Sequence, residues 1–581
     1  MALTAADAKH RVRVSSFISM DTEELIENTT EQDLESIKGF LRNSVHECSQ
    51  RGLYFAAKCS HPSYSVTDEE EQDKYLLAKT YFDVKEFDRA AYVLNGCVGV
   101  KQRFLRVYAK YLAGEKRKEE DNHDIMSPLD DPKAVNKELL ELIDELETWY
   151  NNGEMDGFLL YIYGVILRQR CAQSKATEIL LKSINAYPYN WSAWVELVGT
   201  FANQSANGIS RNIACIIPNL HFYPLYLTHK AKHISSHLPQ SFMTKFFQLY
   251  CAVELHDNAK NFNQMTEEVP KVFENNNFVK TQKAIYAYHN QNYAEAEQEF
   301  DSLIESDPYR LDDMDIFSNV LYVMEKKAKL SYLAHMSSAT DKYRSETMCI
   351  VGNYYSLKFE REKAISYFKR ALQVNRNCLT AWTLMGHEYV ELKNTHAAVV
   401  AYKRALEVNP RDYRAWFGLG QTYECLQMPF YAMYYYQRAV VLRPSDARMW
   451  GALAALYAKQ SLQVEAIKCY QRVLGCTDND IESSTAAIIK LARLYESLNR
   501  DKAASYFEMV LQQKARQLAT VDEDEAEHAH IFLAYYKRDK GDIAAATLHA
   551  QEMMEYGDAA KEEARKLMSE LNTRQNALPF S

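Results

Sequence analysis

A period of 34 residues is the feature of this chain that most restricts its fold. Between residues 379 and 444, two consecutive segments carry matching residue types at eight positions in the same order. A repeat of this length is one supersecondary unit, which buries its apolar face only by stacking on its neighbours, so the chain is predicted to be a solenoid. The matching residues are Trp382, Met385, Gly386, Tyr389, Ala398, Tyr402, Ala405 and Pro410, followed by Trp416, Leu419, Gly420, Tyr423, Ala432, Tyr436, Ala439 and Pro444.

The spacing inside each segment predicts a pair of helices. Large residues recur at intervals of three and four, which places them on one stripe of a helix. The glycines and alanines are expected where the two helices cross, the tyrosines between one pair and the next, and the prolines where the second helix ends. The pattern resembles the tetratricopeptide repeat position by position. The residues assigned to this packing are Trp382, Gly386, Tyr389, Ala398, Trp416, Gly420, Tyr423 and Ala432.

Looser copies of the unit extend the pattern along much of the chain. Only 18 glycines and 13 prolines occur in 581 residues, which favours one helix after another. The predicted fold is therefore all-α, a right-handed superhelical solenoid of tetratricopeptide repeats. The looser copies lie at 157–190, 277–310, 345–378 and 447–480, and a unit at 311–344 is inferred from register, with Leu321 and Ala334.

Changes in pattern suggest a division of the chain. The charged stretch from Glu115 to Pro132 is predicted to be an exposed loop, and the acidic stretch from Asp522 to Glu527 a solvated connection. The predicted parts are an N-terminal helical segment (1–70), N-terminal repeats (71–200), an irregular or degenerate region (201–276), a C-terminal repeat array with a groove (277–560), and a helix end with a disordered tail from residue 572 (561–581).

Composition and missing motifs argue against several classes of protein. The net charge of −10 does not suit a general nucleic-acid binder. No apolar run has the length of a membrane span or of a signal-peptide core, so a soluble intracellular protein is expected. The 11 cysteines form no C-x-x-C pair, and phosphate-loop, zinc-protease and serine-hydrolase motifs are missing. We therefore expect no enzyme activity, no metal and no cofactor.

Two local features have a functional and a plain interpretation. His229, His233 and His237 would share one face of a helix and could bind zinc or copper, but no carboxylate or cysteine completes the set, and a solvated face is the simpler interpretation. Ser127 precedes Pro128 in the charged stretch, where a proline-directed kinase could act; this is a hypothesis of regulation.

The first helix of each pair is expected to line a concave groove. Carboxylates and amides recur at the lining positions, which suits a peptide that carries arginine, although the same residues could simply solvate the face. Lysines and arginines that would bind acidic chaperone tails are replaced there by Asp315, Glu346 and Cys349. The candidate groove residues are Asn319, Asn353, His387, Glu388 and Gln421.

Four stretches are more distinctive than the generic repeat. Residues 81–97, 307–323, 352–372 and 381–424 resemble the family of the eighth subunit of the anaphase-promoting complex, and the resemblance covers about residues 70–570. It implies a homodimeric scaffold in the nucleus and cytoplasm, paired through its N-terminal repeats and stacked on other repeat and platform subunits of a mitotic ubiquitin ligase. It also implies that the C-terminal groove receives an arginine-containing motif of an activator protein.

Two other classes remain as alternatives. The chain could be a repeat adaptor of another assembly in trafficking or chaperone work, which the acidic groove argues against. It could also be an enzyme with repeats attached, such as a sugar transferase, but the repeats leave no room for a catalytic domain.

Overall fold

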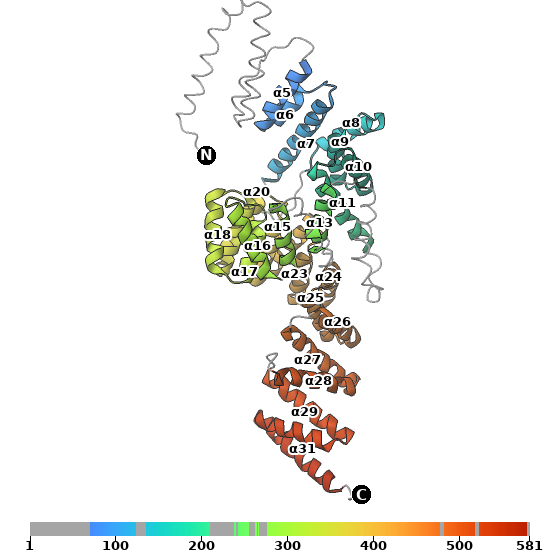
Figure 1. Cartoon of the computed structure of the whole chain (residues 1–581), viewed down its shortest axis with the longest axis vertical. Helices are drawn as coiled ribbons and strands as arrows, with labels where there is room; N and C mark the ends of the chain where they lie inside the picture. Colours follow the sequence, from blue (N-terminus) through green and yellow to red (C-terminus); the bar gives the residue numbers. More distant parts are fainter. Residues whose placement is uncertain are drawn as a thin grey trace, which may run out of the picture. The chain divides into compact units, whose positions relative to one another are not determined.

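The computed structural model describes residues 70–123, 135–209, 238–239, 242–254, 262–263, 265–266, 276–476, 481–516 and 522–577. Every regular element in these residues is helical (Figure 1). Contacts divide the chain into two compact units, one of residues 1–204 with 234–247 and the other of residues 205–233 with 248–581. The predicted all-α repeat fold is confirmed, whereas the finer division of the chain made from the sequence stays a prediction.

The first unit begins with four helices that carry many charged residues, and the apolar helix α9 follows them. Helix α9 is buried on nearly all its sides, because its sequence from Gly157 to Gln169 is almost wholly apolar. A Cβ atom on its Gly164 would meet the Leu180 side chain at 2.6 Å, so glycine permits the close crossing with α10. The helices are α5 (Glu70–Asp83), α6 (Phe87–Val93), α7 (Val100–His123), α8 (Glu138–Asn152), α9 (Gly157–Gln169), α10 (Gln173–Ala186) and α11 (Trp191–Ile209).

The second unit is a succession of helix pairs. Figure 1 shows its later helices stacked in chain order toward the C-terminus. Its helices are α15 (Asn277–His289), α16 (Tyr293–Ser306), α17 (Met314–Val323), α18 (Lys327–Thr340), α19 (Ser345–Leu357), α20 (Arg361–Val374), α21 (Leu379–Glu391), α22 (Thr395–Val408), α23 (Tyr413–Cys425), α24 (Pro429–Leu442), α25 (Ala447–Lys459), α26 (Gln463–Cys476), α27 (Ile481–Leu498), α28 (Arg500–Ala515), α29 (Glu523–Lys540), α30 (Ile543–Glu552), the short η2 (Met553–Glu555) and α31 (Asp558–Ala577). The division between the two units falls within α11, between residues 204 and 205, and again within α13 (Phe242–Glu254), between residues 247 and 248.

Three successive repeats hold their tryptophans by the same hydrogen bond. Trp382 Nε1 donates to the backbone carbonyl of Arg376 at 2.8 Å, and Trp416 and Trp450 donate to Pro410 and Pro444 in the same way. The bond ties the start of one pair to the turn that ends the previous pair. Trp382 is 1% exposed and Trp416 is half-buried, so Trp382 is the more deeply packed of the two.

The predicted small residues lie at the helix crossings. A Cβ atom on Gly386 would lie 2.5 Å from Cε1 of Tyr402, and a Cβ atom on Gly418 would lie 2.5 Å from Cζ of the same ring. Ala398 and Ala432 are fully buried at the equivalent crossings. The Tyr402 ring is therefore held between the first helices of two successive repeats.

Substitution of Gly386 by alanine is expected to lower the free energy of unfolding by about 1–3 kcal/mol, because the buried Tyr402 ring cannot move aside. Gly451 in α25 is the matched control, since nothing lies within 4 Å of its Cβ position. Gly451→Ala should leave stability unchanged or raise it by up to ~1 kcal/mol through helix propensity. Chemical denaturation of both variants checks this, and equal behaviour of the two would contradict the crowding at Gly386.

The turns inside the helix pairs reveal a feature that the sequence did not indicate. Glu325, Phe359, Lys393, Gln427 and Ser461 all have positive φ values between 54° and 63°, at the same position of successive repeats. The chain after α21 is typical, because the backbone N–H of Asn394 donates to the Tyr389 carbonyl at 2.9 Å. Such helix ends usually carry glycine, so these turns could not be located by glycine.

Four predictions about irregular stretches and their boundaries are wrong in part. The predicted loop from Glu115 to Pro132 begins as helix, because α7 continues to His123; oppositely charged neighbours such as Lys118 and Glu115 pair along it at 3.1 Å. The acidic stretch from Asp522 forms the first turn of α29, where the helix dipole favours carboxylates. Helix α31 extends to Ala577, beyond the predicted start of the tail, and α11 continues to Ile209, past the predicted boundary at 201.

Candidate functional site

The predicted groove residues occupy one register of successive first helices. Asn319 lies on α17, Asn353 on α19, His387 with Glu388 on α21, and Gln421 on α23. Because the repeats stack in order, these positions form a row along one face. That these residues form one binding surface stays a prediction, and their environments differ from one another: Asn319, Asn353 and Glu388 are buried, whereas Gln421 is exposed.

The two asparagines are joined and buried. Asn353 is 1% exposed, and its Nδ2 donates to Asn319 Oδ1 and to Ser318 Oγ, both at 2.7 Å. Both donors of the Asn353 amide are thus used within the protein. Its Oδ1 is the atom left to accept a hydrogen bond from a ligand.

Glu388 is a buried carboxylate with an incompletely used oxygen. The residue is 5% exposed; its Oε1 accepts from Ser356 Oγ at 2.5 Å, and its Oε2 lies 3.6 Å from Arg361 Nη1. Oε2 accepts no hydrogen bond from the residues that the structure describes. Burial raises the pKa of Glu388, while the Ser356 hydrogen bond and the Arg361 charge act to lower it. A ligand that brings N–H donors would complete this site.

His387 is held as a neutral side chain. Its Nδ1 lies 2.7 Å from the Tyr402 hydroxyl, and the residue is half-buried. Burial, with the charge of Arg414 in second place, lowers the pKa of His387 to about 4, although Asp412 acts in the opposite direction. At neutral pH the imidazole therefore adds no positive charge that would repel a cationic ligand. Gln421, one repeat further on, is exposed.

A long-range contact that the sequence did not predict brackets these helices. Arg414 Nη1 donates to the Tyr288 hydroxyl at 2.8 Å, and Gln291 Nε2 donates to Asp446 Oδ2 at 3.0 Å. We call this set, Tyr288, Gln291, Asp412, Arg414 and Asp446, the clasp. It joins the last turn of α15 and the turn after it to the N-termini of α23 and α25, and α17, α19 and α21 lie between these segments in the chain. A repeat pattern reports only adjacent units, so it holds no signal for pairs this far apart.

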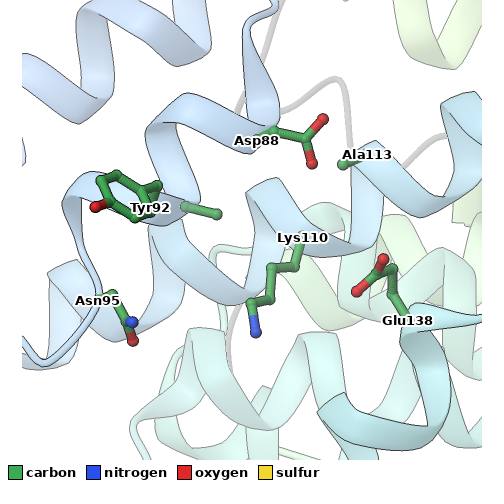
Figure 2. Close-up of a pocket in the computed structure, with 7 residues that line it drawn as sticks. Asp88, Tyr92, Asn95, Lys110, Ala113 and Glu138 are labelled. Atoms are coloured by element: carbon green, nitrogen blue, oxygen red, sulfur yellow. The ribbon is translucent and has the colours of Figure 1, made fainter.

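The first unit contains a separate small hollow, drawn in Figure 2. Its volume is about 230 Å³, and α6, α7 and α8 provide its walls. Arg117 joins two of its carboxylates, with 2.5 Å to Asp88 and 2.6 Å to Glu138. The hollow is lined by Asp88, Ala91, Tyr92, Asn95, Lys110, Ala113 and Glu138.

Other predicted features can be placed only in part. The histidines at 229, 233 and 237 and the Ser127–Pro128 pair lie outside the described residues. Within the described part of the chain, no three histidine, cysteine or acidic side chains gather as a metal site would require. None of the described helices combines the length and the apolar character needed to cross a bilayer.

Known proteins give a consistent set of similarities. The family described as "Anaphase promoting complex subunit 8 / Cdc23" matches residues 58–284, and tetratricopeptide repeat families match residues 345–378 and 386–426. "Anaphase-promoting complex subunit 8" of Arabidopsis thaliana is 43% identical over 325 residues, which are 56% of this chain and 52% of that one. The protein of the same name in Dictyostelium discoideum is 34% identical over 436 residues, 63% of this chain and 69% of that one.

A solved structure shares the fold. "Crystal structure of APC/C hetero-tetramer Cut9-Hcn1" matches with a TM-score of 0.58 and 15% sequence identity, and the match covers 92% of this chain and 97% of that one. The match to the Arabidopsis relative spans about half of that protein's length.

Proposed function

The chain belongs to the anaphase-promoting complex subunit 8 / Cdc23 family, and from this membership we propose that it is a non-catalytic scaffold of that cell-cycle ubiquitin ligase. Its groove in the second unit would bind an arginine-containing motif of an activator protein and so promote ubiquitination of mitotic substrates. The catalytic work would then belong to other subunits.

Glu388 is the observation that supports the groove assignment. A buried carboxylate oxygen without a hydrogen-bond donor matches a guanidinium, which presents two parallel N–H groups. A hydrogen bond to a charged group contributes about 1.5–3 kcal/mol in such surroundings. Neutral His387 and the acceptor oxygen of Asn353 lie in the same register and are compatible with this ligand.

The proposed partners extend to the first unit. We propose that the N-terminal repeats pair two copies of the chain and that the array stacks on other repeat and platform subunits, in the nucleus and cytoplasm. Large apolar side chains on the first unit support a contact surface there, with Tyr92 81% exposed and Val98 65% exposed. Sedimentation of the full chain measures the pairing.

Peptide binding to the full chain tests the groove. We expect a fluorescent peptide that spans the activator's arginine-containing motif to bind the wild type, and the same peptide with citrulline in place of arginine to bind at least tenfold more weakly. Glu388→Gln should weaken the arginine peptide by about tenfold, through loss of a charged hydrogen bond. Asn353→Ala should weaken it less, since only one acceptor is lost.

Glu391→Gln is the matched control. Glu391 lies on the same helix and also pairs with Arg361, at 3.1 Å, but its side chain is 58% exposed. This variant should bind within twofold of wild type, and circular dichroism verifies the fold of each variant. Equal affinity of Glu388→Gln and wild type would refute the site, and equal affinity of the arginine and citrulline peptides would refute the proposed ligand.

A further inference from the structure

Two aspartates one repeat apart are built in the same way. Asp412 caps the N-terminus of α23, and Asp446 caps that of α25. In each case Oδ1 accepts from the backbone N–H and from Nε of the arginine two residues later, at 3.1–3.3 Å. The shared geometry makes Asp446 an internal reference for what Asp412 can bind.

The two carboxylates differ in their second oxygen. Asp446 Oδ2 accepts hydrogen bonds from Arg448 Nη2 and from Gln291 Nε2, both at 3.0 Å. Gln291 lies in the turn after α15. Asp412 Oδ2 accepts from no described residue, although the Asp412 side chain is only 2% exposed. A buried acceptor without a donor costs about 1–3 kcal/mol. Asp412 thus lacks a hydrogen bond that the equivalent position has.

The reason lies in the neighbouring arginine. Arg414 directs its Nη1 to the Tyr288 hydroxyl at 2.8 Å, whereas Arg448 turns its guanidinium onto its own aspartate. Arg414 therefore neutralises the charge of Asp412 through Nε while leaving Oδ2 without a donor. The Arg414 side chain is 29% exposed, and it is the group that would shift to admit a donor.

Asp412 is continuous with the candidate groove. Tyr402 contacts the Cβ position of Gly418 on α23, and its hydroxyl bonds to His387 on α21. The charges of Asp412 and Arg414 both act on His387. A peptide that engages Glu388 beside His387 would therefore run close to Asp412.

We propose that Asp412 is a second subsite of the groove, where a neutral hydrogen-bond donor of the bound peptide takes the position that Gln291 takes at Asp446. The donor would be a backbone N–H or a side-chain amide, because Gln291 fills the equivalent position at Asp446 with a neutral amide and a neutral donor leaves the ion pair between Asp412 and Arg414 intact. This inference rests on the proposed function and adds that the ligand is recognised at two points, an arginine and an amide.

The test compares Asp412→Asn with Asp446→Asn in the full chain, using the activator peptide. Asparagine caps a helix as well as aspartate does, so both variants should fold. We expect Asp412→Asn to weaken binding about fivefold to twentyfold, and Asp446→Asn to remain within twofold of wild type. A series of peptides, each with one backbone amide methylated, should contain one member that binds wild type more weakly than the unmodified peptide does. On Asp412→Asn the same methylation should cause no further loss of affinity.

The outcomes separate the two proposals. If the peptide binds wild type and both variants equally well, or weakens equally on both, the subsite is refuted and the groove assignment stands. If each methylation lowers the affinity for Asp412→Asn as much as it lowers the affinity for wild type, the proposed backbone amide donor is refuted. If the unmodified peptide does not bind wild type, the proposed function fails and this inference falls with it.

Discussion

Replacement of Trp382 by alanine is expected to lower the free energy of unfolding by about 3–5 kcal/mol. Trp382 is among the largest side chains that are fully buried, and its Nε1 holds the carbonyl of Arg376. Alanine would leave both a cavity and a backbone carbonyl without its donor. Because the same bond recurs at Trp416 and Trp450, the loss concerns a joint between repeats rather than a local peculiarity.

Hydrogen exchange is the appropriate measurement for this variant. A repeat array can open locally, so a single melting temperature would not locate the damage. We expect faster exchange in peptides from α21 and α22 than in those from α29. Tyr332→Ala on α18 is the control, because Tyr332 is 67% exposed and should change stability by no more than ~0.5 kcal/mol. If hydrogen exchange in α21 and α22 is as slow in Trp382→Ala as in wild type, Trp382 does not stabilise the junction between these repeats.

The repeat core could be predicted from the sequence because its contacts are local. Gly386 meets Tyr402 in the very next helix, and the crossing recurs at Gly420 and Tyr436. A contact between adjacent helices leaves a periodic trace in the sequence, and this trace also located the weak unit at 311–344, where Leu321 is fully buried. Fold class and the row of groove positions both follow from that period.

What could not be predicted depends on contacts or conformations without such a trace. Lys393 has a positive φ value but is not a glycine, so the sequence does not mark its turn. A charged segment such as the one after Glu115 can form either an exposed helix or an exposed loop, and its composition does not distinguish the two. The clasp between Tyr288 and Arg414 joins residues 126 positions apart in the chain. Its closure depends on the accumulated rotation of the intervening repeats, which no single repeat encodes.

The candidate site divides in the same way. The repeat positions of Asn319, Asn353 and His387 could be predicted from the sequence, but the hydrogen bonds and the charge of their side chains could not. Asn353 spends its amide donors on Ser318 and Asn319, and burial keeps His387 neutral. These properties depend on which side chains the neighbouring helices bring near. They are compatible with the proposed ligand, which would donate hydrogen bonds to Asn353 Oδ1 and to the Glu388 carboxylate.

Reversal of the charge at Glu388 should have the largest effect on binding. In Glu388→Lys the groove loses a charged hydrogen bond, and the new ammonium would face the ligand's guanidinium, which costs several kcal/mol. The two terms predict at least a 100-fold loss of affinity for the arginine peptide. Glu391→Lys makes the same change of net charge on the exposed side of the same helix, and it should bind within about threefold of wild type.

A further variant is needed to distinguish loss of binding in Glu388→Lys from loss of folding. The introduced ammonium would lie beside Arg361, whose Nη1 is 3.6 Å from Glu388 Oε2 in the native protein, and two like charges there would destabilise α21. Adding Arg361→Gln removes the repulsion, so the double variant should regain the native circular dichroism while peptide binding stays lost. The double variant separates the effect on folding from the effect on binding. If it binds the peptide as tightly as wild type does, Glu388 is not part of the binding site, whatever the single variant shows.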